Sequence, residues 1–184
     1  VTDMGREDTR KAIEAANEAW PAYRDLTAKE RSTLLRKWFN LILENRNELA
    51  KLMTLECGKV LNESLGEVTY GAGFVEWFAE EAKRTYGDVI TANSKDRRIV
   101  TRKVGPSLAA GSPVVVKPPT ETPLTALAIS HLAELAGFPP GVYNTVTTSD
   151  NSEVGKELCE NKKVRKLSFT GSTAVGKVLM SQSA

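Results

Sequence analysis

The sequence is poor in the residues that most often build metal and redox centres. Its 184 residues include two cysteines, Cys57 and Cys159, and one histidine, His131. Two cysteines do not make the disulfide framework of a small secreted protein, so we expect a reducing compartment. A single histidine without a cluster of other ligands does not predict a metal site. No metal is therefore expected, and His131 is assigned no role.

Long apolar runs and a strong net charge are also missing. No run reaches the roughly 20 apolar residues that span a membrane. The net charge is +2, and basic residues cluster only briefly around Arg97 and Arg102, so neither a membrane nor a nucleic acid is predicted as a partner. The chain starts at Val1 rather than at a methionine. We expect a cytoplasmic protein; a targeting peptide before Val1 would instead direct it to the mitochondrial matrix.

Helical periodicity runs through most of the first hundred residues. Thr27 and Glu30 have the spacing of a capping box, in which each side chain accepts a hydrogen bond from the other residue's backbone amide. Gly58 and Gly87 are placed to end helices. Four helices are predicted, starting near Glu7, Thr27, Asn45 and Leu61. Residues 1–100 are therefore expected to form a helical layer.

From Val114 onward the pattern alternates between short β-branched runs and helical stretches. Three strands are predicted, at Val114–Val116, Val142–Val146 and Val164–Phe169. Three helices are predicted to follow them, one N-capped by Thr122, one over Asn151–Cys159 and one over Thr173–Met180. This βαβαβα order predicts a parallel sheet with right-handed crossovers. The chain is thus expected to be an α/β protein in which a helical layer precedes a partial doubly wound, Rossmann-like sheet.

A lysine stands where the first predicted strand ends. Lys117 follows Val116 directly and is followed by Pro118 and Pro119. In open α/β sheets, ligands bind at the carboxyl edge of the strands. The pattern therefore predicts that Lys117 lies at a ligand-binding edge.

A glycine-rich turn follows the third predicted strand, with the sequence F-T-G-S-T-A-V-G-K from Phe169 to Lys177. Small residues at a strand-to-helix turn let backbone amides approach a phosphate. A plain turn capped by a serine or threonine explains the same residues equally well. The turn is also close to a P-loop, but Val178 replaces the hydroxyl residue that would bind magnesium, so we interpret this match as accidental.

Three motifs together resemble the aldehyde dehydrogenase superfamily: V-V-V-K-P-x-x-x-T-P (114–123), G-F-P-P-G-V-Y-N (137–144) and F-T-G-S-T-x-x-G (169–176). Two further stretches, E-R-S-T-L-L-R-K-W (30–38) and T-R-K-V-G-P (101–106), are similar to its succinate-semialdehyde branch. The resemblance implies a homo-oligomeric enzyme that oxidises a small aldehyde, succinate semialdehyde in this branch, with NAD or NADP. It assigns residues 1–100 to the helical part of the cofactor-binding domain and 101–184 to its incomplete Rossmann-like part.

The resemblance also implies roles for individual residues. Lys117 would bond the ribose hydroxyls, Gly141 would lie near the adenine and Thr170 near the nicotinamide. Arg102 would hold the distal carboxylate of the substrate through a two-pronged contact; a solvated charge in a basic run is the alternative for this arginine. The implied cofactor residues are Lys117, Pro118, Pro119, Thr120, Gly141, Thr170, Gly171, Ser172, Thr173, Ala174, Val175 and Gly176.

Thr120 bears on the choice between NAD and NADP. Relatives that prefer NAD usually carry a glutamate at this position, and its charge repels a 2′-phosphate. The neutral Thr120 leaves room for that phosphate, so NADP is expected to be tolerated or preferred. Glu121 is the next residue, and a carboxylate swinging inward from there would reverse this expectation.

The departures from the family concern catalysis. Its nucleophilic cysteine and general-base glutamate fall beyond Ala184, so no catalytic residue and no catalytic domain are expected in this chain. Relatives also carry a strand and an oxyanion-hole loop where Val100 here joins Thr101 directly. A mis-predicted gene, a skipped exon and a genuine short form all explain this junction. The alternative to an active dehydrogenase is therefore a truncated, catalytically dead form that keeps part of the cofactor surface, and its oligomerisation is left open.

Overall fold

A computed structural model describes residues 1–84 and 104–183 of the chain. The N-terminal part is helical throughout, and two short strands appear after residue 113. The helices are α1 (Arg6–Arg24), α2 (Ala28–Glu44), α3 (Arg46–Cys57), α4 (Leu61–Glu81), the 3-10 turn η1 (Ala82–Arg84), α5 (Val104–Ala109), α6 (Leu124–Leu135), α7 (Asn151–Glu160) and α8 (Thr173–Gln182). The strands are β1 (Val114–Val116) and β2 (Tyr143–Thr145).

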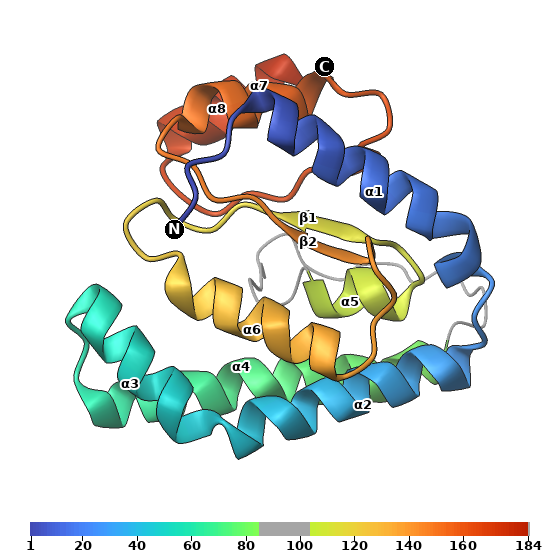
Figure 1. Ribbon diagram of the computed structural model, residues 1–184, viewed down its shortest axis with the longest axis vertical. Coiled ribbons are helices and arrows are strands. Elements are labelled where there is room, and N and C mark those ends of the chain that lie inside the picture. Colours follow the sequence, from blue (N-terminus) through green and yellow to red (C-terminus); the bar gives the residue numbers. More distant parts are fainter. Residues whose placement is uncertain (85–103, 184) are drawn as a thin grey trace, which may run out of the picture.

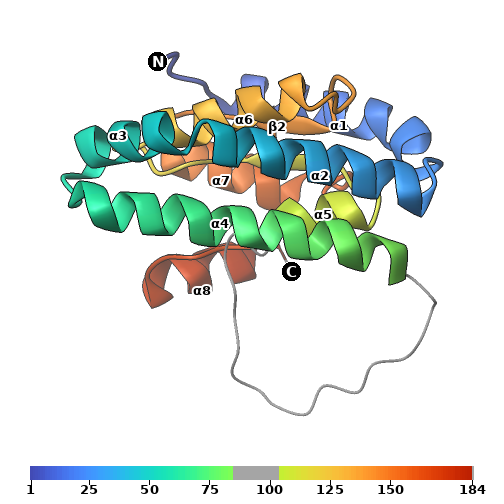
Figure 2. The same cartoon turned by 90° about the horizontal axis from the view of Figure 1, so that it is seen from below.

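The two strands form a small parallel sheet between layers of helices. Val114 pairs with Tyr143 and Val116 with Thr145. Helix α1 contacts both strands and α7 on one side, whereas α6 packs on β2 from the other side and rests on α2 and α3. Figures 1 and 2 show α2, α3 and α4 as the outer layer beneath α6. The expected helical layer followed by an α/β unit is therefore confirmed.

The third predicted strand is wrong for the described part of the chain. Residues 164–169 form no strand, and their side chains are half-buried or exposed. A strand in a parallel sheet must be hydrogen-bonded to a neighbour and covered on both faces. Neither condition is met here, because the sheet ends after two strands and α8 packs chiefly on α7 and buries no residue of its own.

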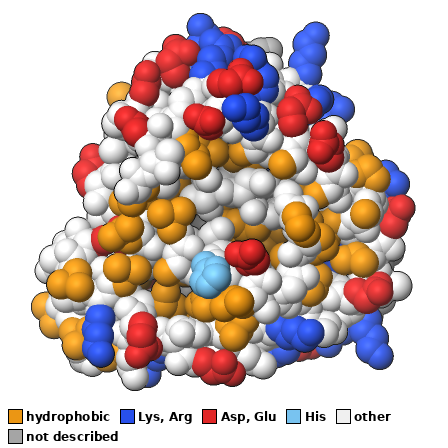
Figure 3. Space-filling view, in the orientation of Figure 1, with side chains coloured by type: hydrophobic (Ala, Val, Ile, Leu, Met, Phe, Trp, Pro, Cys, Tyr) orange, Lys and Arg blue, Asp and Glu red, His pale blue; other side chains and the backbone are white. Residues whose placement is uncertain are grey.

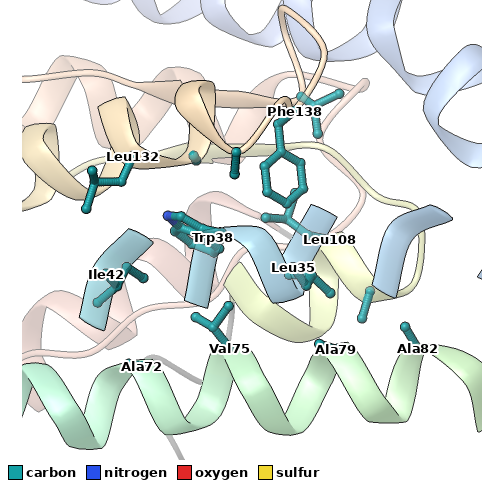
Figure 4. Close-up of a cluster of buried hydrophobic side chains, with 14 of the residues drawn as sticks. Leu35, Trp38, Ile42, Ala72, Val75, Ala79, Ala82, Leu108, Leu132 and Phe138 are labelled. Atoms are coloured by element: carbon teal, nitrogen blue, oxygen red, sulfur yellow. The ribbon is translucent and has the colours of Figure 1, made fainter. Parts of the chain in front are cut away.

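The core lies where α2, α4, α5 and α6 meet the loop before β2 (Figure 4). Trp38 of α2 is its centre, with its ring edge-on to Phe138 and Tyr143. The indole nitrogen donates a hydrogen bond of 3.1 Å to the carbonyl of Ile129, so burial of Trp38 leaves no polar atom unpaired. Small residues of α4, Ala72 and Ala79, let this helix approach α2 closely.

One buried carboxylate joins α1 to α7. Glu157 has a side chain that is only 5% exposed and accepts hydrogen bonds from Arg6 Nε at 2.8 Å and from Arg10 Nη2 at 3.1 Å. The side-chain amide of Asn161 donates a further bond of 3.0 Å. The bond from Arg10, together with those from Asn161 and Arg6, lowers the pKa of Glu157 from 4.5 to about 2. The two helices are thus held together by an ion cluster as well as by apolar contacts.

Replacing Glu157 by glutamine should lower the free energy of unfolding by about 2 kcal/mol at neutral pH, since a pKa unit corresponds to about 1.4 kcal/mol and the exposed arginines are partly screened. Because the folded pKa lies below the unfolded one, this contribution is full above pH 4.5 and disappears as the pH falls towards 2. Urea unfolding at several pH values measures it. Glu160→Gln is the control, because Glu160 also pairs with Arg6 at 3.2 Å but is exposed, and its loss should cost at most about 1 kcal/mol. An equal loss for both variants would contradict the role of Glu157.

Candidate functional site

The carboxyl ends of β1 and β2 lie at one edge of the sheet, and Lys117 stands at that edge. The lysine is half-buried immediately after Val116. Burial lowers the pKa of Lys117, while the negative charge of Glu121 opposes this shift. Thr145, the last residue of β2, has a buried hydroxyl without a partner among the described residues. The edge thus combines a cation with spare hydrogen-bonding capacity, as a polar ligand requires.

Thr120 ties the loop after β1 to the loop after β2. Its hydroxyl lies 2.9 Å from the carbonyl of Thr148, to which it donates, and 3.2 Å from Oδ1 of Asn151. Thr148 itself is buried. The segment from Lys117 to Thr120 is therefore fixed against the start of α7, and sequence reasoning had not identified this link.

Carboxylates of the chain occupy two of the helix N-termini at this edge. The amides of Leu124 and Thr125 at the start of α6 both donate to Glu56, the latter at 2.9 Å. The predicted N-cap Thr122 is wrong for this reason: the N-cap is Pro123, and the capping acceptor is Glu56 of α3. At the start of α7, Asp150 accepts from the amides of Ser152 and Glu153.

The start of α8 differs, because a neutral hydroxyl caps it. Ser172 accepts from the amide of Val175 at 3.3 Å, and the first turn of α8 contains no acidic residue. In both views α8 begins at the same end of the molecule as the loop that follows β1 (Figures 1 and 2). Of the helices α6, α7 and α8, only α8 therefore offers amides without a carboxylate already on them, and such amides attract anions.

The ring of Phe169 lies against Gly171. A β-carbon on Gly171 would come within 2.4 Å of Cζ of Phe169, and the same ring is within 4 Å of the corresponding position on Gly176. The side chain of Phe169 is 42% exposed, so it covers the turn without being enclosed. Gly171 therefore makes room for the ring, whereas a β-carbon on Gly176 would meet it only at ordinary van der Waals distance.

Gly141 is not brought to this edge. It precedes β2, at the amino end of the strand, and its backbone has a φ of +82°. A β-carbon there would stand 2.5 Å from the carbonyl oxygen of Ala15, so α1 packs directly on this glycine. The structure thus gives Gly141 a packing role in a place apart from Lys117, and its role near an adenine stays a prediction.

A hollow on the face shown in Figure 3 also lies at the amino end of the sheet. Its volume is about 380 Å³, and Leu127, His131, Phe138 and Gly141 are among its lining residues. The histidine, pale blue in Figure 3, faces Glu134 at 3.4 Å. The hollow contains none of the predicted cofactor residues except Gly141 and is separate from the Lys117 edge.

Several other expectations concern nucleophiles, metals and membranes. Both cysteines are free thiols, and burial, with the charge of Glu160, raises the pKa of Cys159. Across residues 1–84 and 104–183, histidine, cysteine and acidic side chains form no group of three that would hold a metal, and no helix is apolar and long enough to cross a bilayer. Arg102 and the Val100–Thr101 junction lie outside the described residues.

The profile of the aldehyde dehydrogenase family matches residues 1–104 and 97–184. The chain belongs to the aldehyde dehydrogenase family. The two matched segments meet at residues 97–104, which agrees with an internal gap at Val100/Thr101 in this aldehyde dehydrogenase chain. Alignments to relatives extend over 206 positions, more than its 184 residues, so gaps open within it.

Among curated relatives, the chain is 52% identical to the succinate-semialdehyde dehydrogenase GabD of Escherichia coli (strain K12), whose name specifies NADP(+). It is 50% identical to a glutarate-semialdehyde dehydrogenase of Pseudomonas aeruginosa. Each alignment covers 100% of this chain and 42% of the relative. Among solved structures, an E. coli NADP-dependent enzyme superposes with a TM-score of 0.91 at 51% identity, again over 100% of this chain and 42% of the other. The chain therefore spans less than half the length of these aldehyde dehydrogenases.

Proposed function

We propose that this chain forms the ribose-binding wall of a semialdehyde dehydrogenase that uses NAD or NADP. The observation that carries the proposal is the position of Lys117, a half-buried cation at the carboxyl edge of two parallel strands. A lysine ammonium with three donors suits ribose hydroxyls and phosphate oxygens alike. When bound, the nicotinamide ring of such a cofactor accepts a hydride from the substrate.

The residues around Lys117 fit this cofactor in part. The lysine and the carboxylate-free start of α8 supply positive charge for a ribose and a pyrophosphate. In contrast, Glu56 and Asp150 exclude an anion from the starts of α6 and α7. The exposed face of Gly171 is filled by Phe169, so close approach to that glycine requires the ring to turn aside. Pyrophosphate binding is therefore proposed at the amides after Ser172 and not at the other two helices.

The proposal accommodates NADP as well as NAD. Thr120 carries no charge, and Lys117 beside it attracts a 2′-phosphate, which supports NADP. Glu56, Glu121 and Asp150 are acidic residues near this wall; Glu56 is committed to the amides of α6 and Asp150 to those of α7. Glu121 is thus the residue that would favour NAD. We propose that the chain accepts NADP, the cofactor in the name of the E. coli relative.

The substrate proposed is a semialdehyde with a distal carboxylate. Relatives named for succinate semialdehyde and for glutarate semialdehyde differ in their substrates by one methylene, and both substrates end in a carboxylate. We assign Arg102 to this carboxylate, because a guanidinium binds it through two parallel, charge-assisted bonds. Oxidation of the aldehyde needs a nucleophile that the residues described here do not supply.

The two cysteines favour a second candidate for the chain alone, namely cofactor binding without turnover. A nucleophilic cysteine needs a lowered pKa, whereas burial raises that of Cys159, whose thiol faces the carbonyl of Leu179. The thiol of Cys57 is directed to the carbonyl of Met53 at the end of α3. Neither residue is set up to attack an aldehyde.

Calorimetric titration of the purified chain with NADP and with NAD tests the binding proposal. We expect saturable binding that weakens about tenfold or more in Lys117→Met, because a charge-assisted hydrogen bond is worth roughly 1.5–3 kcal/mol. Lys156→Met, on the exposed side of α7, is the control and should bind as the wild type does. Unchanged affinity in Lys117→Met, or no binding by the wild type, would contradict the proposal.

An absorbance assay for the reduced cofactor separates the two candidates. The chain alone, supplied with succinate or glutarate semialdehyde and NADP or NAD, is expected to reduce no cofactor. Turnover that needs both aldehyde and cofactor would show that the chain is an active dehydrogenase and would overturn the second candidate.

A further inference from the structure

The N-terminal segment Thr2–Met4 runs beside the loop that follows β2. The amide of Met4 donates to the carbonyl of Thr147 at 2.8 Å, and the hydroxyl of Thr147 donates to the carbonyl of Thr2 at 2.7 Å. Asp3, between them, accepts two bonds from Ser149: one from its amide at 2.7 Å and one from its hydroxyl at 2.6 Å. Four hydrogen bonds therefore fix this loop to residues 2–4.

The same loop holds the wall that contains Lys117. Its residue Thr148 accepts the hydroxyl of Thr120 at 2.9 Å through its carbonyl and the amide of Asp150 at 3.0 Å through its own hydroxyl. Thr147 and Thr148 are each only 5% exposed, so this part of the loop is packed as well as hydrogen-bonded. Asp3 is thus connected to Thr120 by its hydrogen bonds to Ser149, the peptide bond between Ser149 and Thr148, and the hydrogen bond from Thr120 to the Thr148 carbonyl.

We propose that Asp3 is a positioning residue for the cofactor wall, acting through the Ser149 loop on Thr120 and thereby on Lys117. The inference rests on the proposed function for the identity of the ligand, but the link from Asp3 to Thr120 stands on contacts alone. Asp3 touches no cofactor-binding residue itself. Its effect is to keep the carbonyl of Thr148 where Thr120 can reach it.

The hydrogen bonds between Asp3 and Ser149 are of a kind that holds a loop firmly in place. Charge-assisted bonds to a carboxylate are shorter and about twice as strong as neutral ones, and both bonds to Ser149 lie at the short end of the usual range. The hydrogen bonds from Ser149 lower the pKa of Asp3, so the carboxylate keeps its charge at neutral pH. A neutral side chain of similar size would retain at most one of the two acceptors.

Asp8 provides a matched comparison. Its carboxylate also accepts a backbone bond, from the amide of Gly5 at 3.1 Å, and it lies only five residues away in the first turn of α1. No hydrogen bond joins Asp8 to residues 147–151 in the described part of the chain. A change that merely loosens the start of α1 should therefore appear in Asp8→Ala as well as in Asp3→Ala.

Amide hydrogen exchange at Ser149, amide NMR resonances of residues 120–122 and nucleotide titration of the whole chain test the inference. In Asp3→Ala we expect exchange at the amide of Ser149 to quicken about tenfold, because its charged hydrogen bond has been lost. The amide NMR resonances of residues 120–122 should shift, because the acceptor of the Thr120 hydroxyl is no longer held in place. The affinity for NADP should fall about fivefold or more, whereas Asp8→Ala should leave all three quantities as in the wild type. Asp3→Asn keeps one acceptor, so its effects should lie between those of the wild type and those of Asp3→Ala. It is the variant to measure if Asp3→Ala does not fold.

The outcomes separate the inference from the proposed function. Faster exchange at Ser149 with unshifted amide resonances at residues 120–122 would overturn the positioning role. Equal effects of Asp3→Ala and Asp8→Ala would overturn it too. A wild-type chain that binds no NADP or NAD would overturn the proposed function, while the amide resonances of residues 120–122 would still decide whether Asp3 positions the wall.

Discussion

Replacing Gly141 by alanine is expected to lower the free energy of unfolding by about 3–4 kcal/mol, the largest effect of any single methyl group that we consider. Two costs combine at this residue. Its φ of +82° lies in the left-handed region, which a β-carbon disfavours. The new β-carbon would also meet the carbonyl oxygen of Ala15 at 2.5 Å, and that oxygen belongs to the backbone of α1 and cannot swing away.

Gly137→Ala is the matched control for this result. Its φ of +94° carries the same conformational cost, but its β-carbon would find only the flexible end of Leu34, at 3.7 Å. We expect a loss of about 1–2 kcal/mol there. Urea unfolding of both variants measures the difference. Similar losses for the two would show that α1 can shift away from Gly141, contrary to the packing described.

The same variant bears on function, because the family resemblance places Gly141 near an adenine. If Gly141 serves packing, Gly141→Ala should lose stability and, in the fraction that stays folded, bind NADP like the wild type. A variant of normal stability with weakened NADP binding would instead favour the cofactor role. Measuring both the free energy of unfolding and the NADP affinity of Gly141→Ala therefore shows whether Gly141 serves packing or cofactor binding.

Local features of this fold could be predicted from sequence, and long-range ones could not. The capping box of Thr27 and Glu30 forms as expected, with bonds of 3.2 and 2.7 Å, because both partners lie within one turn. The strand before Lys117 was predicted for the same reason, since β-branched residues next to prolines define it locally. Such signals need no knowledge of the rest of the chain.

The capping of α6 shows what local reasoning misses. Thr122 is of a residue type, and at a position, typical of an N-cap. Instead, Glu56 of α3 accepts the hydrogen bond from the amide of Thr125, which lies 69 residues further along the chain. The helical layer must first be packed under α6 before this carboxylate is within reach.

The missing third strand has a comparable cause. Residues 164–169 include the apolar Val164, Leu167 and Phe169, but strand formation depends on a neighbour elsewhere in the sheet, and the described sheet contains only β1 and β2. Helix α8 then leaves Val175, Val178 and Met180 about half exposed or more. The apolar residues of this region therefore predict burial that the described part of the chain does not provide.

Replacing Arg31 by methionine should lower the free energy of unfolding by about 3 kcal/mol, because carbonyls left without a donor in a buried site cost roughly 1–3 kcal/mol each. Arg31 is 9% exposed. Its Nε donates to the carbonyl of Ala109 at 2.9 Å, and Nη1 donates to the carbonyl of Leu26. The guanidinium therefore donates hydrogen bonds both to a carbonyl in the last turn of α5 and to one in the turn between α1 and α2.

The effect of Arg31→Met should extend to the candidate site, because α5 leads directly into β1 and Lys117. Gly111, which begins this connection with a φ of +82°, packs against the side chain of Arg31. Arg36→Met, on the same helix, removes exposed ion pairs to Glu76 and Glu80 and should cost at most about 1 kcal/mol. Urea unfolding compares the two variants, and hydrogen exchange at Val114–Val116 shows whether β1 loosens. Equal stability losses, or unchanged exchange in β1, would mean that α5 keeps its place without Arg31 and that Lys117 is positioned by the sheet alone.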